Sequence, residues 1–145
     1  MAIFYGIRSG PSITPSFEQV FNSLGDFTYT DTGFELPTTT GRRSVSWTDI
    51  QAMFGYKRDL YTTDLVCLDI FCDNGQGIRL HEEIPGWFQF IRKLPEHFPS
   101  IKPGWEIELT FPAFETNFTL LYERNGLSLP QAAAIHYQPE STITK

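Results

Sequence analysis

Alternation of apolar and polar side chains predicts that much of this chain forms short β-strands. Phe27 and Tyr29 alternate with polar residues ahead of the turn sequence Asp-Thr-Gly at residues 31–33. Phe34 and Leu36 repeat the alternation after that turn. Two alternating runs separated by a short, polar, glycine-containing turn predict a β-hairpin.

The strongest strand pattern lies in the middle of the chain. Residues 65–72 are apolar on both faces, as in a central strand that is covered on each side. Residues 53–58 predict the strand that precedes it. The phase of the apolar positions changes between Trp47 and Ile50, so we expect a bend or bulge near Asp49 that returns both side chains to the core.

A second hairpin is predicted at Asn74-Gly75. Asparagine followed by glycine accepts the positive φ angles of the tight turns that join antiparallel strands. The strand after this turn directs Ile78 and Leu80 toward the core, because both positions have the same parity.

Two segments show helical rather than strand spacing. Residues 16–24 place apolar side chains on one face, and Ser16 with Gln19 forms a capping box. The second helix is expected to start near Pro85 and to kink or restart at Pro95. Its apolar stripe, which should close over the sheet, consists of Trp87, Phe90, Ile91, Leu94 and Phe98.

Beyond this helix the pattern becomes strand-like and then polar. Residues 105–111 alternate between apolar and polar side chains and predict a further strand, and Phe114 extends the apolar content. The stretch 126–145 is polar and contains proline, so we expect a loose tail with a short turn at 131–135. Residues 1–125 are then a single domain.

The length, net charge and apolar content of the chain indicate its size class and the kinds of partner that it would bind. A chain of 145 residues is long enough for one domain whose core needs no disulfide or metal. The formal net charge of −6 opposes binding to nucleic acid and to anionic membranes. No run reaches the roughly 18 apolar residues of a membrane span, and the start of the sequence lacks a signal-peptide pattern. We therefore expect a cytoplasmic protein with neither nucleic acid nor membrane as partner.

The two cysteines are predicted to be reduced core thiols. Cys67 and Cys72 lie five residues apart in an apolar strand and so face opposite sides of it. Neither a disulfide between them nor joint ligation of one metal ion is compatible with that spacing. We expect no cofactor.

Residues at the end of the Asn-Gly hairpin suggest either a metal site or a purely structural role. His81, Glu82 and Glu83 follow this hairpin, and Asp69 and Asp73 precede its second strand. Alternation directs Glu82 away from the other two, whereas metal ligands must converge from one side. A solvated strand end that leads into a helix is the favoured interpretation.

Charged residues also flank the turn between the two central strands. Asp59 and Asp64, with Lys57 and Arg58, would suit general acid–base chemistry. Charges beside a hairpin turn more commonly protect the sheet edge and keep it soluble. The alternative function is a small metal-dependent hydrolase that uses His81 and the Asp59 to Asp64 region.

The aromatic residues divide into core and surface candidates. Trp47, Trp87 and Trp105 are in phase with apolar neighbours, which predicts burial. Several tyrosines are less clearly in phase, and tyrosine and arginine dominate the energetics of protein interfaces. The candidates for a partner-binding surface are Tyr56, Arg58, Tyr61 and Tyr122.

The order of the predicted elements resembles that of bacterial pleckstrin-homology-like (PH-like) domains. The resemblance covers about the middle half of the chain and rests on four segments, which are residues 44–50, 65–71, 78–80 and 87–94. It implies an α+β fold that is mainly antiparallel β, with a curved sheet or partly open barrel closed by one amphipathic helix. It further implies a platform for protein or lipid partners, and the acidic first hairpin loop, at residues 31–33, disfavours lipid.

Small acidic proteins of this build also look like immunity proteins of bacterial toxin systems, which mask the surface of a partner. An acidic face would complement a basic target such as a nuclease. The sequence therefore favours a non-catalytic protein-interaction module over an enzyme.

Overall fold

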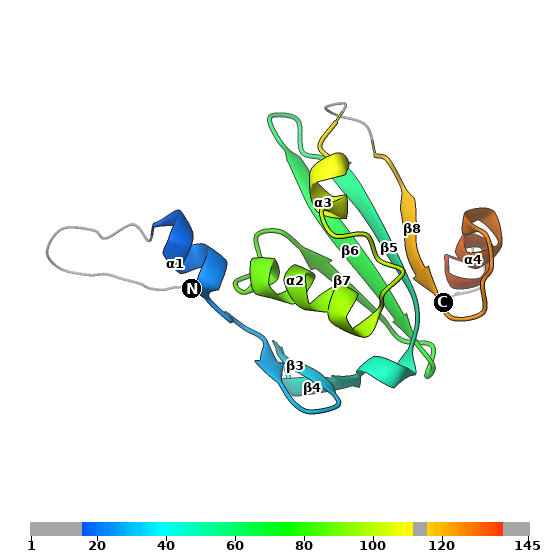
Figure 1. The fold of residues 1–145 in the computed structure, drawn as a ribbon, viewed down its shortest axis with the longest axis horizontal. Coiled ribbons are helices and arrows are strands. Elements are labelled where there is room, and N and C mark those ends of the chain that lie inside the picture. The colour runs from blue at the N-terminus through cyan, green and yellow to red at the C-terminus, as the bar shows by residue number, and fades with distance from the viewer. Residues whose placement is uncertain (1–15, 112–115, 138–145) are drawn as a thin grey trace, which may run out of the picture.

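The chain forms two antiparallel sheets joined by a bend, with helices packed against the larger one (Figure 1). The computed structural model describes residues 16–111 and 116–137. The smaller sheet has the strand order β2-β3-β4 and the larger one the order β7-β6-β5-β8. The elements, in chain order, are α1 Phe17–Asn22, β2 Thr28–Tyr29, β3 Gly33–Thr38, β4 Gly41–Ser46, the 3-10 turn η1 Trp47–Asp49, β5 Ile50–Asp59, β6 Asp64–Cys72, β7 Gly77–His81, α2 Trp87–His97, α3 Trp105–Glu108, β8 Thr119–Glu123 and α4 Leu129–His136. The coarse prediction of an α+β fold with antiparallel sheets is confirmed.

Both predicted hairpins are present. Strand β2 pairs with β3 across the turn at residues 31–33. Strand β6 pairs with β7 across Asn74-Gly75, and Gly75 has a φ angle of 81°, which asparagine-glycine turns accommodate easily. The bend near Asp49 is the short 3-10 turn η1, after which the chain crosses into the larger sheet.

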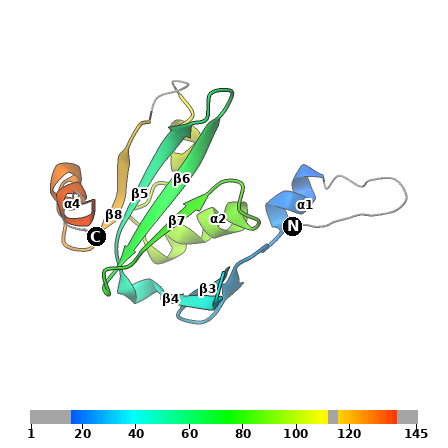
Figure 2. The same cartoon turned by 180° about the vertical axis from the view of Figure 1, so that it is seen from behind.

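The main core lies between the larger sheet and helix α2, which Figure 2 shows behind the strands. The predicted apolar stripe of α2 is buried there together with side chains from both sheets, which confirms that this helix covers the sheet. At the centre of the aromatic contacts, Phe90 stacks on Phe27 with ring centroids 4.6 Å apart and meets Phe34 edge-on at 4.9 Å. The shared cluster includes Trp47, Leu68, Ile70, Trp87, Phe90 and Leu94.

The predictions that Pro85 lies in the first turn of α2 and that the helix restarts at Pro95 are wrong. The helix begins at Trp87 rather than at Pro85, because Gly86 caps it with a φ angle of 94°. Pro85 instead uses its carbonyl to accept a hydrogen bond from the backbone of Asp26, which ties the chain after α1 to the helix entry. Pro95 lies inside one continuous helix that runs on to His97, so the helix does not restart there, and a kink at Pro95 stays a prediction.

The strand predicted at residues 105–111 is wrong, because Trp105–Glu108 forms the short helix α3. Trp105 and Leu109, four residues apart, are buried, whereas Ile107 and Phe111 are 63% and 76% exposed. Residues four apart share a face in a strand and also in a helix, so alternation alone does not distinguish the two structures. Packing in the folded chain selects the helix. Gly55 in β5 makes room for this choice, since a Cβ there would lie 2.5 Å from the Trp105 ring.

The far face of the larger sheet is covered by α4, so the expectation of a loose tail is wrong for residues 129–136. Ala132 is fully buried against Ala52 and Phe54 of β5. The His136 ring stacks on Phe71 with centroids 4.8 Å apart. Ser128 and Gln131 form a capping box that starts this helix.

Helix α1 is the least buried element. It ends at Asn22, two residues earlier than expected, and the capping box of Ser16 and Gln19 is confirmed. Its contacts run mainly to α2, where Phe88 lies 5.9 Å from Phe21 between ring centroids. Phe114 and the last part of the predicted tail, 138–145, lie outside the described residues. Within the described residues no helix combines the length and hydrophobicity needed to cross a membrane.

Replacing Trp87 by alanine is expected to lower the free energy of unfolding by about 3–5 kcal/mol, because it removes a buried ring and leaves a cavity beside Trp105. Denaturant unfolding monitored by circular dichroism measures the change. Phe111→Ala, at an exposed aromatic, is the matched control and should change the free energy of unfolding little. A loss below 1 kcal/mol for Trp87→Ala would show that α2 is peripheral to the core.

Candidate interaction surface

The tyrosines predicted to share a surface are separated by the structure. Tyr61 is 94% exposed, whereas Tyr56 is only 8% exposed. The expectation that Tyr56 belongs to an exposed surface is therefore wrong, because Phe118, the residue before β8, packs beside its ring. Tyr122 is also partly buried, with its ring 4.6 Å from that of Phe98.

Tyr61 occupies the tip of the β5–β6 hairpin in an uncommon backbone conformation. Its φ angle is 76°, in the left-handed region that favours glycine. Local hydrogen bonds hold the turn. The Tyr61 backbone N–H donates to Asp59 Oδ1 at 2.8 Å, the Leu60 N–H donates to the Thr63 carbonyl at 2.9 Å, and the Thr62 N–H donates to the Leu60 carbonyl at 2.9 Å. Together Arg58, Leu60 and Tyr61, all exposed, form what we call the tip surface.

Further exposed apolar side chains lie at the same end of the larger sheet. Figure 1 shows α3 beside the β5–β6 loop. Backbone contacts agree, since the Lys57 N–H donates to the Thr116 carbonyl at 2.8 Å and Asn117 Nδ2 donates to the Phe111 carbonyl at 3.0 Å. Exposed Phe111 is thus linked to the segment that pairs with the base of the hairpin. This end of the larger sheet therefore presents two exposed aromatic rings, Tyr61 from the β5–β6 turn and Phe111 from the segment after α3.

The residues of the hydrolase alternative do not converge. His81 pairs with Cys67 on the α4 face of the sheet, whereas Asp64 lies on the opposite face and contacts buried Lys57 at 3.2 Å. Asp59 caps the tip turn, and Glu82 Oε1 accepts the Val66 N–H at 2.8 Å. In residues 16–111 and 116–137 no group of three or more His, Cys, Asp or Glu side chains is placed to hold a metal ion.

A buried carboxylate network is the first feature that the sequence did not reveal. Asp69, in the middle of β6, is only 3% exposed. It accepts hydrogen bonds from Tyr56 Oη at 3.1 Å, from Tyr137 Oη at 2.6 Å, and from Arg79 Nε and Nη2 at 2.9 and 3.1 Å. Strands β5, β6 and β7 and the residue after α4 thus meet at one charge. A single acidic residue in an otherwise apolar strand was the available clue.

Both tyrosines of this network stay protonated over the ordinary pH range. Burial raises the pKa of Tyr137, and its hydrogen bond to Asp69 raises that pKa further. Burial also raises the pKa of Tyr56. Each hydroxyl therefore remains a donor to the carboxylate. Burial also lowers the pKa of His136, the last residue of α4. This shift favours the neutral form of the ring that stacks on Phe71.

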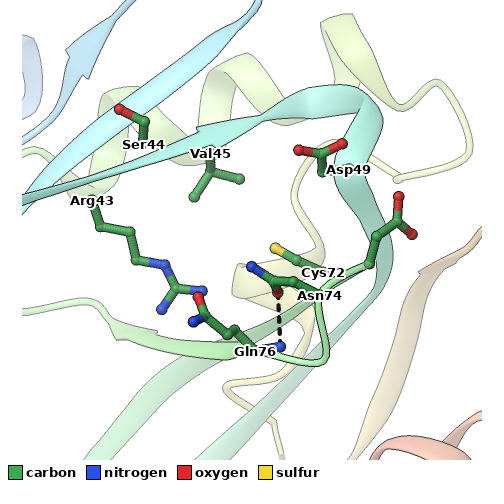
Figure 3. Close-up of a pocket in the computed structure, with 8 residues that line it drawn as sticks. Arg43, Ser44, Val45, Asp49, Cys72, Asn74 and Gln76 are labelled. Carbon is green, nitrogen blue, oxygen red and sulfur yellow. Dashed lines mark hydrogen bonds between the residues drawn. The ribbon is translucent and has the colours of Figure 1, made fainter.

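The second unpredicted feature is a hollow between the two sheets, shown in Figure 3. It has a volume of about 200 Å³ and is lined by β4 and the β6–β7 turn. Arg43 extends from β4 toward Gln76, and Asp49 lies across the hollow (Figure 3). Among the described residues, partly buried Arg43 has neither a hydrogen-bond nor an ion-pair partner. Asp73 on the rim is occupied by Arg124, whose Nη1 lies 2.6 Å from its Oδ1.

Comparison of this chain with models of protein families, with curated proteins and with solved structures finds no match. The resemblance to PH-like domains therefore stays a prediction.

Replacing Tyr137 by phenylalanine should cost about 1.5–3 kcal/mol, because it removes a hydrogen bond to a buried carboxylate. Denaturant unfolding at pH 7 measures the cost, and Tyr61→Phe, whose hydroxyl lies at the exposed tip, is the control. Because folding raises the Tyr137 pKa above its usual 10.0, its contribution is complete below pH 10 and is lost as the pH rises further. The difference between wild type and Tyr137→Phe should therefore shrink above pH 10. Equal costs for Tyr137→Phe and Tyr61→Phe would argue against the network.

Cys67 and Cys72 are both free and buried, on opposite faces of β6 as predicted. Burial raises the pKa of both thiols, so little reactive thiolate forms near neutral pH. We expect slow reaction with a thiol reagent in the native protein and rapid titration of two thiols in denaturant. Fast labelling of the native protein at either position, located by peptide mass spectrometry, would contradict this.

Proposed function

We propose that this protein is a non-catalytic interaction module that binds a protein partner through the tip surface. The observation that carries the proposal is Tyr61, which is almost fully exposed at a position whose backbone would suit glycine better. Arg58 and Leu60 flank it with further exposed contact groups.

The conformation of Tyr61 gives the proposal its physical basis. A non-glycine residue in the left-handed region costs of order 1–3 kcal/mol, and such strain concentrates at functional sites. A large ring in water gains nothing from burial to offset that cost. Contact with a partner would supply the missing burial, and tyrosine and arginine are the side chains that contribute most at interface centres.

Charge favours one form of the module, an immunity-type inhibitor that masks a basic partner such as a toxin nuclease. The net charge of −6 supports it, because opposite charge steers association and raises the rate of encounter. The PH-like resemblance is a second part of the proposal. It is supported by the two antiparallel sheets and by α2 covering the larger one.

Tyr61→Gly should separate stability from binding. Glycine relieves the left-handed strain, so the free energy of unfolding should stay equal or rise by about 1 kcal/mol. Binding of the partner should nevertheless weaken, because the exposed ring is lost. Thermal and denaturant unfolding measure stability, and titration of the identified partner by calorimetry measures affinity.

The partner itself can be identified by affinity purification from the native host. Wild type, Arg58→Ala with Tyr61→Ala, and Phe17→Ala should be compared, since Phe17 is an exposed ring on the distant helix α1. Loss of a captured protein in the tip variant alone supports the proposal. Equal capture by all three variants would exclude the tip surface, and a stoichiometric metal ion in the purified protein would favour the hydrolase alternative.

A further inference from the structure

Among the described strands, the two sheets leave an unpaired edge on each side of the space between them. Strand β4 is an outer strand of the smaller sheet, and β7 is an outer strand of the larger one. Besides the hollow of Figure 3, a second one of about 240 Å³ lies between β3 and β7, and Arg43 lines both. We call these two hollows together the inter-sheet cleft.

The hydrogen-bond phase of the β6–β7 pair shows which backbone groups of β7 point away from β6. The Cys72 N–H donates to the Gln76 carbonyl and the Glu82 N–H donates to the Val66 carbonyl, each at 3.0 Å. In an antiparallel pair, bonded and non-bonded residue pairs alternate. Both of these bonds involve even-numbered residues of the β7 segment, so the odd-numbered residues lie in the non-bonded pairs. Arg79, which lies opposite Asp69, is one of them. Its N–H and C=O, with those of the odd-numbered residues beside it, therefore face the free edge of β7.

The cleft also contains a cation on the buried face of the smaller sheet. Arg43 pairs with Leu36 across β3 and β4, and directly opposed residues share a face. Phe34 and Val45 are buried on that same face. A guanidinium that is withdrawn from water is stabilised by an acceptor, best of all by a carboxylate. No acceptor for Arg43 is found in the described parts of the chain.

The other residues that line the inter-sheet cleft indicate which side chains a ligand would carry. Leu36, Ile78 and Leu80 give the second hollow an apolar floor, which suits apolar side chains at alternate positions of a strand. Exposed Asp26 and Asp49 lie at opposite ends of the cleft. A polyacidic ligand is therefore disfavoured, and one central carboxylate matches Arg43.

We propose that the inter-sheet cleft binds an extended peptide segment of a partner protein, which adds as a strand to β7 and places one carboxylate side chain against Arg43. Strand addition supplies main-chain hydrogen bonds to the open edge, and the side-chain hollows supply specificity. This site is separate from the tip surface, so either can fail without the other.

A random-peptide display library panned on the full chain tests the proposal. Enriched peptides should carry one Asp or Glu flanked by β-branched or aromatic residues at alternate positions. Fluorescence anisotropy of a synthetic enriched peptide should show binding weakened about tenfold or more by Arg43→Gln, because a charge-assisted contact is lost. Arg42→Gln is the matched control, since Arg42 lies on the other face of β4 and contacts Glu35. Failure to enrich any peptide, or equal binding to both variants, overturns the proposal.

Strand addition is tested by His81→Pro, which removes a donor at the β7 edge, against His81→Ala, which keeps it. Only the proline variant should weaken binding of the enriched peptide. As a readout that does not depend on the folding of that variant, the peptide should slow amide hydrogen exchange at Arg79 in the wild type, measured by NMR. Unchanged exchange would overturn strand addition.

Exchange in the free protein identifies any other occupant of the cleft. Protection at Arg79 that rises with protein concentration would mean that a second copy covers the edge. Protection that disappears when residues 2–15 are deleted would mean that the chain's own start covers it. Either result overturns the proposal of a partner peptide, which requires rapid exchange at Arg79 in the free monomer.

Discussion

Burial of the central strands β5 and β6 on both faces is the constraint on which the rest of this fold depends. Their side chains are apolar in both directions, so each face of the sheet must be covered. Helices α2 and α3 cover one face, and α4 with the flanking aromatic residues covers the other. This two-sided packing explains why residues 129–136 are helical and packed. It also commits most of the large rings to the core.

Polar groups on the covered faces are then restricted to positions where they find partners. Asp69 is retained inside by three side chains that donate to it. Lys57, on the opposite face, is held by Asp64. Because an unpaired buried charge is costly, each of these charged groups lies beside a polar or oppositely charged side chain. Arg43 differs, since it lies partly buried without a partner among the described residues.

Groups free to bind a partner are consequently found where packing ends. The tip surface lies at the turn of the β5–β6 hairpin, and the inter-sheet cleft lies between the smaller sheet and the β6–β7 hairpin. The two differ in character. The tip presents a ring held out by a strained turn, whereas the cleft offers an open strand edge beside a cation. A partner that used both would gain affinity through two linked contacts.

Local pattern by itself determined the hairpins at 31–33 and Asn74-Gly75, the two-sided strand at 65–72 and the apolar stripe of α2, because turn chemistry and side-chain period act over a few residues. Tertiary structure decided what periodicity leaves open. Residues 105 and 109 share a face in a strand and also in a helix, and burial of both side chains, with Trp105 packed above Gly55, accompanies the helix. The burial of Tyr56 and the bond from Tyr137 to Asp69, 68 residues away in sequence, follow from α4 and β8 folding back onto the sheet. The position of Arg43, which has no hydrogen-bond or ion-pair partner among the described residues, likewise depends on tertiary structure, because the space that it lines lies between two separate sheets.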